Sequence, residues 1–323
     1  MLYDRIIGHG TINEPEGKPE PLFALPSTVN WMRALKLLVD DLPINFHTAS
    51  NFYRGQNRRI MKQLVENTVF EQLFLSLHHL SSLEKLRTIN PTADVARLGI
   101  LAWYYGISNA ASAMIAAQDG SFQEDHAGTA RIWDTAVASR GLAMGTFGWR
   151  VSSLVERTFE IEVAAYRGAS KGNLQIRPTD ATEAVGVAAG YLSGSAKWYA
   201  WMETERVRKT PEFRALNVAN FRTQAARELR DNRLRPQAMG FLHQASRYRG
   251  KANYREALFL AYGLTTEAML NGFVSDQASV LKAFLAMAGA FAAQKIGPQL
   301  WTQFVADVNA NRAFSIDTSA VWA

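Results

Sequence analysis

Residues 94–118 read DVARLGILAWYYGISNAASAMIAAQ, and this stretch decides the fold class. It contains three consecutive aromatic residues, Trp103, Tyr104 and Tyr105, followed by a run rich in alanine. Alanine has the highest helix propensity of the amino acids, and its small side chain allows neighbouring helices to approach closely. The stretch therefore predicts a helix that packs against other helices on several sides.

The segments before this stretch repeat the helical spacing. Between Arg58 and Arg87 apolar residues recur at intervals of three and four, which is the period of one face of a helix. Pro91 separates the two segments, because a proline disfavours helical geometry in the residue before it. From Val29 a further apolar stripe begins, which includes Trp31.

The segments after the stretch carry helix start signals. Thr179-Asp180 followed by Glu183 is a capping-box pattern. Thr210-Pro211 places a proline at the first position of another helix. The alternating pattern of a β-strand is sparse, and its strongest instance covers residues 173–177 only. The sequence predicts an all-α fold, a multi-helix bundle.

The domain organisation follows from where the helical pattern begins and where it is interrupted. Residues 1–28 contain several prolines and glycines, which predicts an irregular N-terminal arm, with Ser27 or Thr28 capping the first helix. A chain of 323 residues can form one large domain or two smaller ones. We expect a helical core domain over residues 29–265 and a C-terminal helical extension over residues 266–323 that packs on this core.

The composition excludes several classes of protein. The chain is 48% hydrophobic and 20% charged, so it can build a large core and is not disordered. It has no cysteine, which excludes disulfides, thiolate metal sites and cysteine nucleophiles. The first residues lack the pattern of a secretory signal, and the apolar run 283–293 is about half of the roughly 20 residues of a membrane span. We expect a cytoplasmic protein with no membrane partner.

Positive charge is concentrated in one segment. The chain carries a net charge of +6, and residues 222–255 alone hold nine basic residues against two acidic ones, a net charge of +7. The segment ends in RYRGKANYR, residues 247–255, in which tyrosines alternate with cations. Cations neutralise phosphates, and tyrosine rings can stack on unpaired bases. The alternative is that the arginines pair with carboxylates and the tyrosines pack in the core.

This segment supplies the candidate binding residues for RNA or single-stranded DNA. They are Arg230, Arg233, Arg235, Arg247, Tyr248, Arg249, Lys251, Tyr254 and Arg255.

Motifs of common enzyme classes are absent. The chain has no phosphate-binding loop, no complete dinucleotide fingerprint, no H-E-x-x-H and no G-x-S-x-G. No two of its six histidines are four residues apart, which argues against a helical zinc site. We expect no metal and no cofactor.

The aromatic helix and the turn after it resemble a known superfamily. Residues 103–117 are followed by Glu124-Asp125-His126-Ala127-Gly128. An aromatic, alanine-rich helix followed by a polar turn and a histidine resembles the HEPN superfamily, over about a fifth of the chain. This resemblance implies a helical bundle that works with RNA in prokaryotic toxin–antitoxin, antiviral defence or stress systems.

The sequence departs from the nuclease signature of that superfamily. Catalytic HEPN members carry an arginine, four to six residues and then a histidine, whereas Arg235 and His243 are separated by seven residues. The resemblance therefore implies a non-catalytic member. His126 and His243 are the candidates for an atypical acid–base site, with Arg247 or Arg249 holding a phosphate.

Three functions remain open from the sequence. The first is association with RNA or single-stranded DNA without catalysis. The second is a scaffold subunit of a larger assembly, with a protein partner or further copies of the chain. The third is a ribonuclease with an atypical histidine and arginine site.

Overall fold

The computed structural model describes residues 21–253, 255–263 and 266–323. These residues form helices and connecting segments, and the part of the chain so described contains no strand, only an isolated bridge between Val151 and Met239. The prediction of an all-α multi-helix fold is confirmed. Residues 173–177, which carry the strongest alternating pattern, form a turn and irregular backbone.

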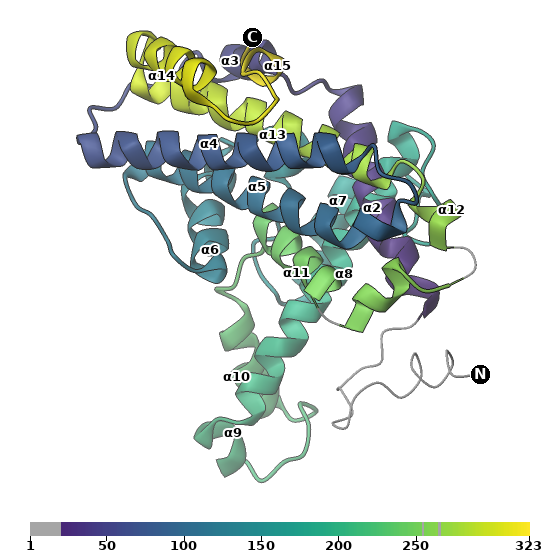
Figure 1. Cartoon of the computed structure of the whole chain (residues 1–323). Helices are drawn as coiled ribbons and strands as arrows, with labels where there is room; N and C mark the ends of the chain where they lie inside the picture. The colour runs from purple at the N-terminus through teal and green to yellow at the C-terminus, as the bar shows by residue number, and fades with distance from the viewer. Residues whose placement is uncertain (1–20, 254, 264–265) are drawn as a thin grey trace.

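Most helices begin and end near the capping residues and prolines that predicted their ends, and most lie in one body (Figure 1). In chain order they are α2 (Pro21–Asp41), α3 (Phe46–Tyr53), α4 (Gln63–Leu86), α5 (Ala93–Asp119), α6 (His126–Ala136), η1 (Ala138–Arg140), η2 (Gly145–Gly148), α7 (Glu156–Arg167), α8 (Ala181–Arg208), α9 (Pro211–Ala215), α10 (Gln224–Leu234), α11 (Phe241–Asn253), η3 (Arg255–Leu260), α12 (Thr266–Leu270), α13 (Phe273–Ile296), α14 (Pro298–Asn311) and α15 (Ser319–Trp322).

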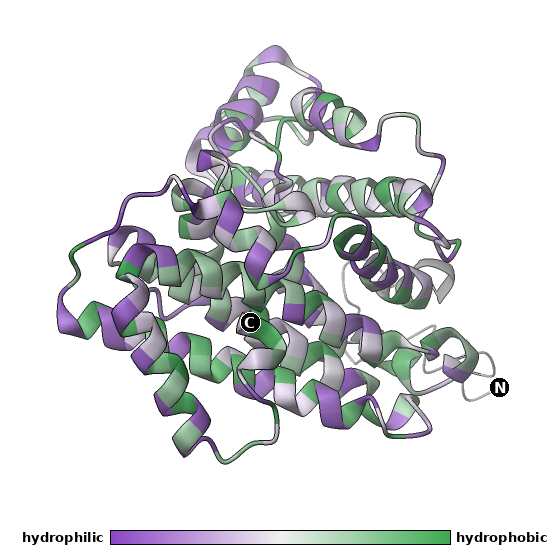
Figure 2. Ribbon diagram, turned by 90° about the horizontal axis from the view of Figure 1, so that it is seen from above, coloured by the Kyte–Doolittle hydropathy of each residue, from purple (hydrophilic) through white to green (hydrophobic). Residues whose placement is uncertain are grey.

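Helix α5 is the centre of the body, as its composition predicts. It packs against α4, α13, α11 and α6. A Cβ atom on Gly106 would lie 2.5 Å from Cδ2 of Leu281, so the missing side chain allows α13 to approach α5 closely. On the other side of α5, the hydroxyl of Ser76 donates to the Gly106 carbonyl at 2.8 Å. The helices of this body carry both apolar and hydrophilic residues along their length, as amphipathic helices do (Figure 2).

An aromatic cluster joins helices that are far apart in sequence. The ring of Trp31 on α2 stacks on Tyr191 of α8, with centroids 4.1 Å apart. Trp31 also contacts Trp103 of α5 and Tyr248 of α11 at centroid distances of 5.8 Å and 4.8 Å. Aromatic pairs contribute about 0.5–1.5 kcal/mol each beyond the burial of their area. This cluster fixes α11 against the core.

The N-terminal prediction needs a correction. Helix α2 begins at Pro21, so residues 21–28 are helical and the irregular arm cannot extend over them; residues 1–20 lie outside the described part of the chain. Ser27 and Thr28 do not cap this helix, because both hydroxyls donate to the carbonyl of Ala24 within it. Burial of Leu25 and Val29 against the core favours the helix despite Pro26.

The C-terminal prediction is also corrected. The predicted extension over residues 266–323 packs on the core, but its helix α13 is also part of that core, because it contacts α2, α3, α4 and α5 and its residues belong to the same apolar cluster as theirs. One continuous core therefore runs from Ala24 to Trp322. The segment Thr266–Ile296 is long and apolar enough to cross a membrane by those two criteria, and 72% of its apolar window is buried inside the fold.

A lobe projects from this body. It consists of residues 203–235, which are the end of α8, α9, α10 and their connections, and it lies at the bottom of Figure 1. Val207, Phe213 and Ala226 form a small apolar core of its own, with Phe221 packed against them. The guanidinium groups of Arg208 and Arg230 lie over the ring of Phe221 at 5.6 Å and 5.9 Å.

Candidate nucleic-acid interface

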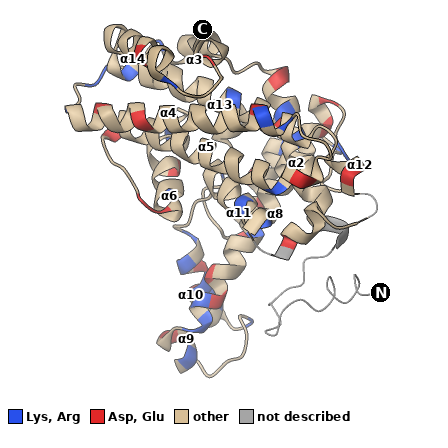
Figure 3. Ribbon diagram, in the orientation of Figure 1, with Lys and Arg blue, Asp and Glu red and all other residues tan. Residues whose placement is uncertain are grey.

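The basic segment is divided between two different environments. Helix α10 lies on the lobe, where lysines and arginines are spread over α9 and α10 (Figure 3). Helix α11 instead packs against α5, α6 and α8 in the body. Residues 222–255 therefore do not form one continuous basic surface.

Two of the predicted binding residues lie inside the protein. Tyr248 has no exposed surface, and its hydroxyl donates to the carbonyl of Thr28 at 3.0 Å. Lys251 is 5% exposed, and its Nζ lies 3.0 Å from Oγ of Ser27 and 3.2 Å from Oε2 of Glu256. Burial lowers the pKa of Lys251. The prediction that Tyr248 and Lys251 contact nucleic acid is wrong, because the core-facing side of α11 includes both positions.

Two more of the predicted residues lie at the edge of the described chain. Tyr254 is outside the described residues. Arg255 is the first residue of η3, and the structure describes its backbone only.

The three candidates on α10 remain near the surface. Nε of Arg230 lies 2.8 Å from Oδ1 of Asp231, and Nε of Arg233 lies 2.7 Å from Oε2 of Glu203. Arg235 is exposed. Exposed ion pairs contribute about 0–1 kcal/mol, so a phosphate can compete with the carboxylate for such an arginine.

A cleft of about 590 Å³ lies where the lobe meets the body. Its walls are α6, the C-terminal half of α8, the connection from α10 to α11 and the first half of α11. Both histidines predicted from the sequence, His126 and His243, line it. The other charged, hydroxyl and aromatic side chains of the wall are Asp125, Arg131, Asp134, Thr135, Trp198, Tyr199, Glu203, Arg206, Arg233 and Ser246.

His243 is held in one orientation by the backbone. The N–H of Gly240 donates to Nδ1 of His243 at 3.2 Å, so the neutral ring carries its hydrogen on Nε2. Burial lowers the pKa of His243 to about 4, and the charge of Asp134 opposes this only in part. The ring of Tyr199 packs edge-on against it at 5.7 Å. At neutral pH His243 is therefore an uncharged hydrogen-bond donor.

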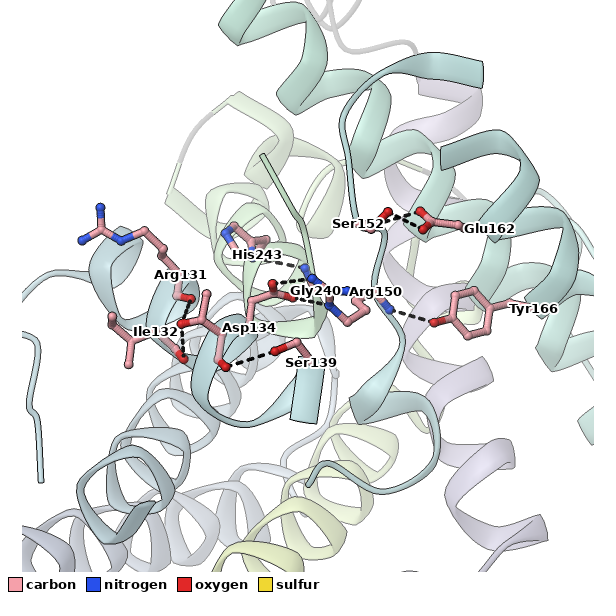
Figure 4. Close-up of polar contacts among 11 residues, drawn as sticks. Arg131, Ile132, Asp134, Ser139, Arg150, Ser152, Glu162, Tyr166, Gly240 and His243 are labelled. Atoms are coloured by element: carbon pink, nitrogen blue, oxygen red, sulfur yellow. Dashed lines mark hydrogen bonds and ion pairs between the residues drawn. The ribbon is translucent and has the colours of Figure 1, made fainter. Parts of the chain in front are cut away.

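A buried ion pair supports this arrangement (Figure 4). Asp134 is 2% exposed and accepts from Nε and Nη2 of Arg150 at 2.9 Å and 2.8 Å. These hydrogen bonds raise the pKa of Arg150. A Cβ atom on Gly240 would lie 3.1 Å from Oδ1 of Asp134, so only a small residue fits beside the pair. Figure 4 shows Arg131 extending from α6 away from this pair.

His126 occupies the first position of α6. Its ring contacts Tyr104 and Tyr105 of α5, with centroids 5.1 Å and 5.7 Å apart. Burial lowers the pKa of His126, the charge of Arg249 lowers it further, and Asp125 acts in the opposite direction. The ring is half-buried and uncharged at neutral pH.

Arg247 and Arg249 point to different surroundings, as expected for residues two apart on a helix. The guanidinium of Arg247 donates to Oγ of Ser195 at 3.3 Å and lies 5.8 Å from the centre of the Trp198 ring. The guanidinium of Arg249 lies 5.0 Å from the centre of the Tyr104 ring. Only Arg249 lies beside a histidine of the cleft, so the structure selects it over Arg247 as the candidate partner of His126.

The lobe side of the cleft is richer in cations than in carboxylates. Glu203 is 8% exposed and pairs with both Arg206 and Arg233. Arg131 is exposed and has no ion-pair partner among the described residues. Trp198 is 37% exposed beside these charges. Cations from α6, α8 and α10 and an accessible indole from α8 therefore line the same cleft.

The sequence did not identify Arg131, Trp198, Arg206 and Ser246 as site residues. Nothing local marks them, because each lies on an ordinary helical segment. They meet only because α6, α8 and α11 converge. The described residues contain no group of three or more His, Asp or Glu side chains that could hold a metal ion.

Comparisons with protein-family models, with curated proteins and with solved structures found no match to this chain.

Proposed function

We propose that this protein binds single-stranded RNA in the cleft between the body and the lobe, without cleaving it. The observation that carries the proposal is that one cleft is lined by an exposed indole, Trp198, together with Arg131, Arg206 and Arg233. Cations that neutralise the backbone and an aromatic ring that stacks on bases are what proteins use to bind single strands.

The dimensions of the cleft favour a single strand over a duplex. A volume of about 590 Å³ lies within the range of small-ligand pockets, roughly 300–1,000 Å³. Such a volume accommodates a nucleotide and part of its neighbour. The exposed arginines of the lobe, such as Arg235, extend the positive potential beyond the cleft and provide contacts for further phosphates.

The histidines favour binding over cleavage. Cleavage of RNA by two histidines requires one to accept a proton and the other to donate one. His243 cannot fill either role well at neutral pH, because its Nδ1 lone pair accepts from Gly240 and its pKa of about 4 leaves the cationic form unpopulated. His126 alone does not make an acid–base pair.

The resemblance to HEPN proteins supplies the proposed biological setting. The aromatic helix and the histidine after it are in contact, through Tyr104, Tyr105 and His126. This contact supports placing the protein in a cytoplasmic defence or stress system of a prokaryote. This proposed setting rests on the resemblance, and it depends on RNA binding as the molecular activity.

The experiment uses two tryptophans on the same helix. Trp198 lines the cleft, and Trp201 is 42% exposed on α8 outside its lining. We expect Trp198→Ala to weaken binding of labelled single-stranded RNA by about 5- to 100-fold, because stacking on one base contributes about 1–3 kcal/mol. Trp201→Ala should leave the affinity unchanged. Duplex DNA and single-stranded DNA serve as competitors, and the RNA is run on a gel afterwards.

Salt dependence is the second part of the experiment. Binding should weaken steeply between low and high salt, because arginine contacts release counterions from the phosphates. Equal effects of the two tryptophan substitutions, or binding that does not change with salt, would contradict the proposal. Shortened RNA on the gel would instead support a ribonuclease.

A second candidate function, a subunit of a larger assembly, is favoured by a separate apolar surface. A groove of about 460 Å³ lies between α4 and α14 and is lined by Phe70, Phe74 and Phe304. Ile60 and Leu64, at the start of the α4 region, are 102% and 77% exposed. Exposed apolar surface of this kind marks protein contacts. A mass measurement that finds a monomer at micromolar concentration, with no co-purifying protein, would count against this candidate.

A further inference from the structure

Three polar side chains of α11 form a stripe along one side of the helix. His243, Ser246 and Arg249 are spaced three residues apart, which places them on one face. His243 and Ser246 both line the cleft. Arg249 comes one turn later, where it faces Tyr104 and lies close enough to His126 to lower its pKa. The stripe therefore leads from the middle of the cleft to the histidine of α6.

Arg249 differs from two other arginines of this region in having no ion-pair partner among the described residues. Arg150 is paired with Asp134, and Arg233 is paired with Glu203. Arg249 has no ion-pair partner among the residues that the structure describes, and its Nε is buried without any hydrogen-bond partner there. A buried donor on a charged group that has no partner is costly, and a water, an ion or a ligand can supply the partner.

The groups around Arg249 are hydrogen-bond donors. His243, with its hydrogen on Nε2, and Ser246, whose hydroxyl is hydrogen-bonded to Tyr104, line the cleft from the same helix. His126 adds an imidazole from α6. Two carboxylates border these groups, and both are engaged. Oδ1 of Asp125 caps α6 by accepting from the Gly128 N–H at 2.7 Å, and Asp134 accepts from Arg150. An arginine surrounded by neutral donors is suited to a tetrahedral oxyanion.

We infer that the part of the cleft lined by His126, His243 and Ser246 is a phosphate seat, in which these side chains hold a phosphate group together with Arg249, which reaches it beside Tyr104. The inference rests on the proposed function in one respect, since it takes the phosphate to belong to the bound RNA strand. It also fixes the orientation of the strand, because Ser246 on α11 and Trp198 on α8 line the cleft from two different helices.

The first experiment tests the seat without RNA. Inorganic phosphate is titrated into the protein while the ring proton signals of its six histidines are followed by NMR. We expect the signals of His126 and His243 to shift with a saturable response, and those of His47 and His78, which lie outside the cleft, to remain in place.

The matched variants are three substitutions at two positions of the same helix. Arg249→Met keeps an unbranched side chain over Tyr104 but removes the charge, and it should weaken phosphate binding at least tenfold. Arg249→Lys should retain part of the affinity. Arg247→Met removes the same charge two residues away, outside the seat, and should leave phosphate binding within about twofold. Circular dichroism and a thermal midpoint establish that each variant is folded.

RNA oligonucleotides then separate the source of the phosphate. A strand with a 5′-phosphate is compared with the same strand lacking it, in the native protein and in Arg249→Met. If Arg249→Met weakens binding of the 5′-phosphorylated strand only, the seat holds the phosphate at the strand end. If the substitution weakens binding of both strands equally, the seat holds an internal phosphodiester.

The two proposals fail in distinguishable ways. If RNA binds and Trp198→Ala weakens it, but phosphate shifts neither histidine and Arg249→Met has no effect, the phosphate seat is wrong and the proposed function stands. If phosphate binds and depends on Arg249, but RNA does not bind, the seat stands and the proposed function is wrong. Equal loss of phosphate binding in Arg249→Met and Arg247→Met would also overturn the seat, because the effect would then be one of net charge.

Discussion

Helices α10 and α11 come from one basic stretch of sequence but have opposite roles. On α10, Arg230, Arg233 and Arg235 lie at the surface, singly or in exposed ion pairs. On α11, Tyr248 and Lys251 are buried, with hydrogen bonds to the N-terminal helix α2. Similar residue types thus contact solvent on α10 and stabilise the core on α11. The difference teaches that the charge of a segment does not show which of its cations are available to a ligand.

The largest expected effect tests the core role of α11. Tyr248→Ala removes a fully buried ring that contacts Trp31 and Trp103, at centroid distances of 4.8 Å and 5.3 Å. Loss of a large buried aromatic side chain costs about 3–5 kcal/mol, so we expect the free energy of unfolding to fall by that amount. Urea denaturation measures it. A change below about 1 kcal/mol would place Tyr248 outside the core and remove the contrast with α10.

The next effect concerns His243 and pH. Its pKa is about 4 in the folded protein, against about 6.5 in the unfolded chain. Below pH 6.5 the unfolded chain takes up a proton that folded His243 does not take up until about pH 4, so acid favours unfolding. Between pH 7 and pH 4.5 we expect this group to remove about 2–3 kcal/mol of stability.

The comparison for this prediction is the variant His243→Gln. The other titratable groups are the same in both proteins, so only the difference between the two pH profiles reports on the histidine. We expect the variant to lose less stability than the native protein as the pH falls. Parallel profiles would show that His243 is not protected from protons, and its assignment as a neutral donor would then be wrong.

A smaller effect tests the link between α10 and the cleft. Glu203 neutralises Arg206 and Arg233 on the lobe side. Glu203→Gln keeps the shape of the side chain but removes its charge, and we expect RNA to bind several-fold more tightly, by about 1 kcal/mol, with a steeper salt dependence. Electrophoretic or fluorescence binding assays measure both. Weaker binding in a folded variant would mean that Glu203 orients the arginines more than it neutralises them.

The smallest effect tests the surface role of α10. Arg235→Ala changes an exposed side chain, so the free energy of unfolding should stay within about 0.5 kcal/mol of the native value. The same substitution should weaken binding of every RNA sequence by a similar, modest factor and lower the salt slope by about one. Lys85→Ala, an exposed cation on α4, is the control for net charge. An equal effect of both substitutions would leave α10 with no special part in binding.

Local signals predicted the fold class and most of the helices. The capping boxes and prolines marked true starts, since Asp180 caps α8 and Pro211 begins α9. Pro26 contributed to the wrong prediction of irregular structure up to residue 28. The local sequence does not show that Leu25 and Val29 are buried, and this burial favours the helix. Local spacing also could not show that α13 lies in the middle of the core.

The candidate site was predicted only in part. The sequence singled out His126 and His243 as isolated candidates, and the structure places both on one cleft. It did not single out Trp198 or Arg206, because neither stands in a motif. The choice between Arg247 and Arg249 stayed open until the helix faces were known.

The sequence by itself determined that this chain is helical and where most of its helices begin and end. It also determined that the positive charge is concentrated in residues 222–255. These properties depend on interactions within a few residues, such as capping, proline geometry and the helical period. Only the tertiary structure decided which cations are buried and which side chains share a cleft. Those properties depend on how α6, α8 and α11 pack together, and packing of residues more than a hundred positions apart leaves no local pattern.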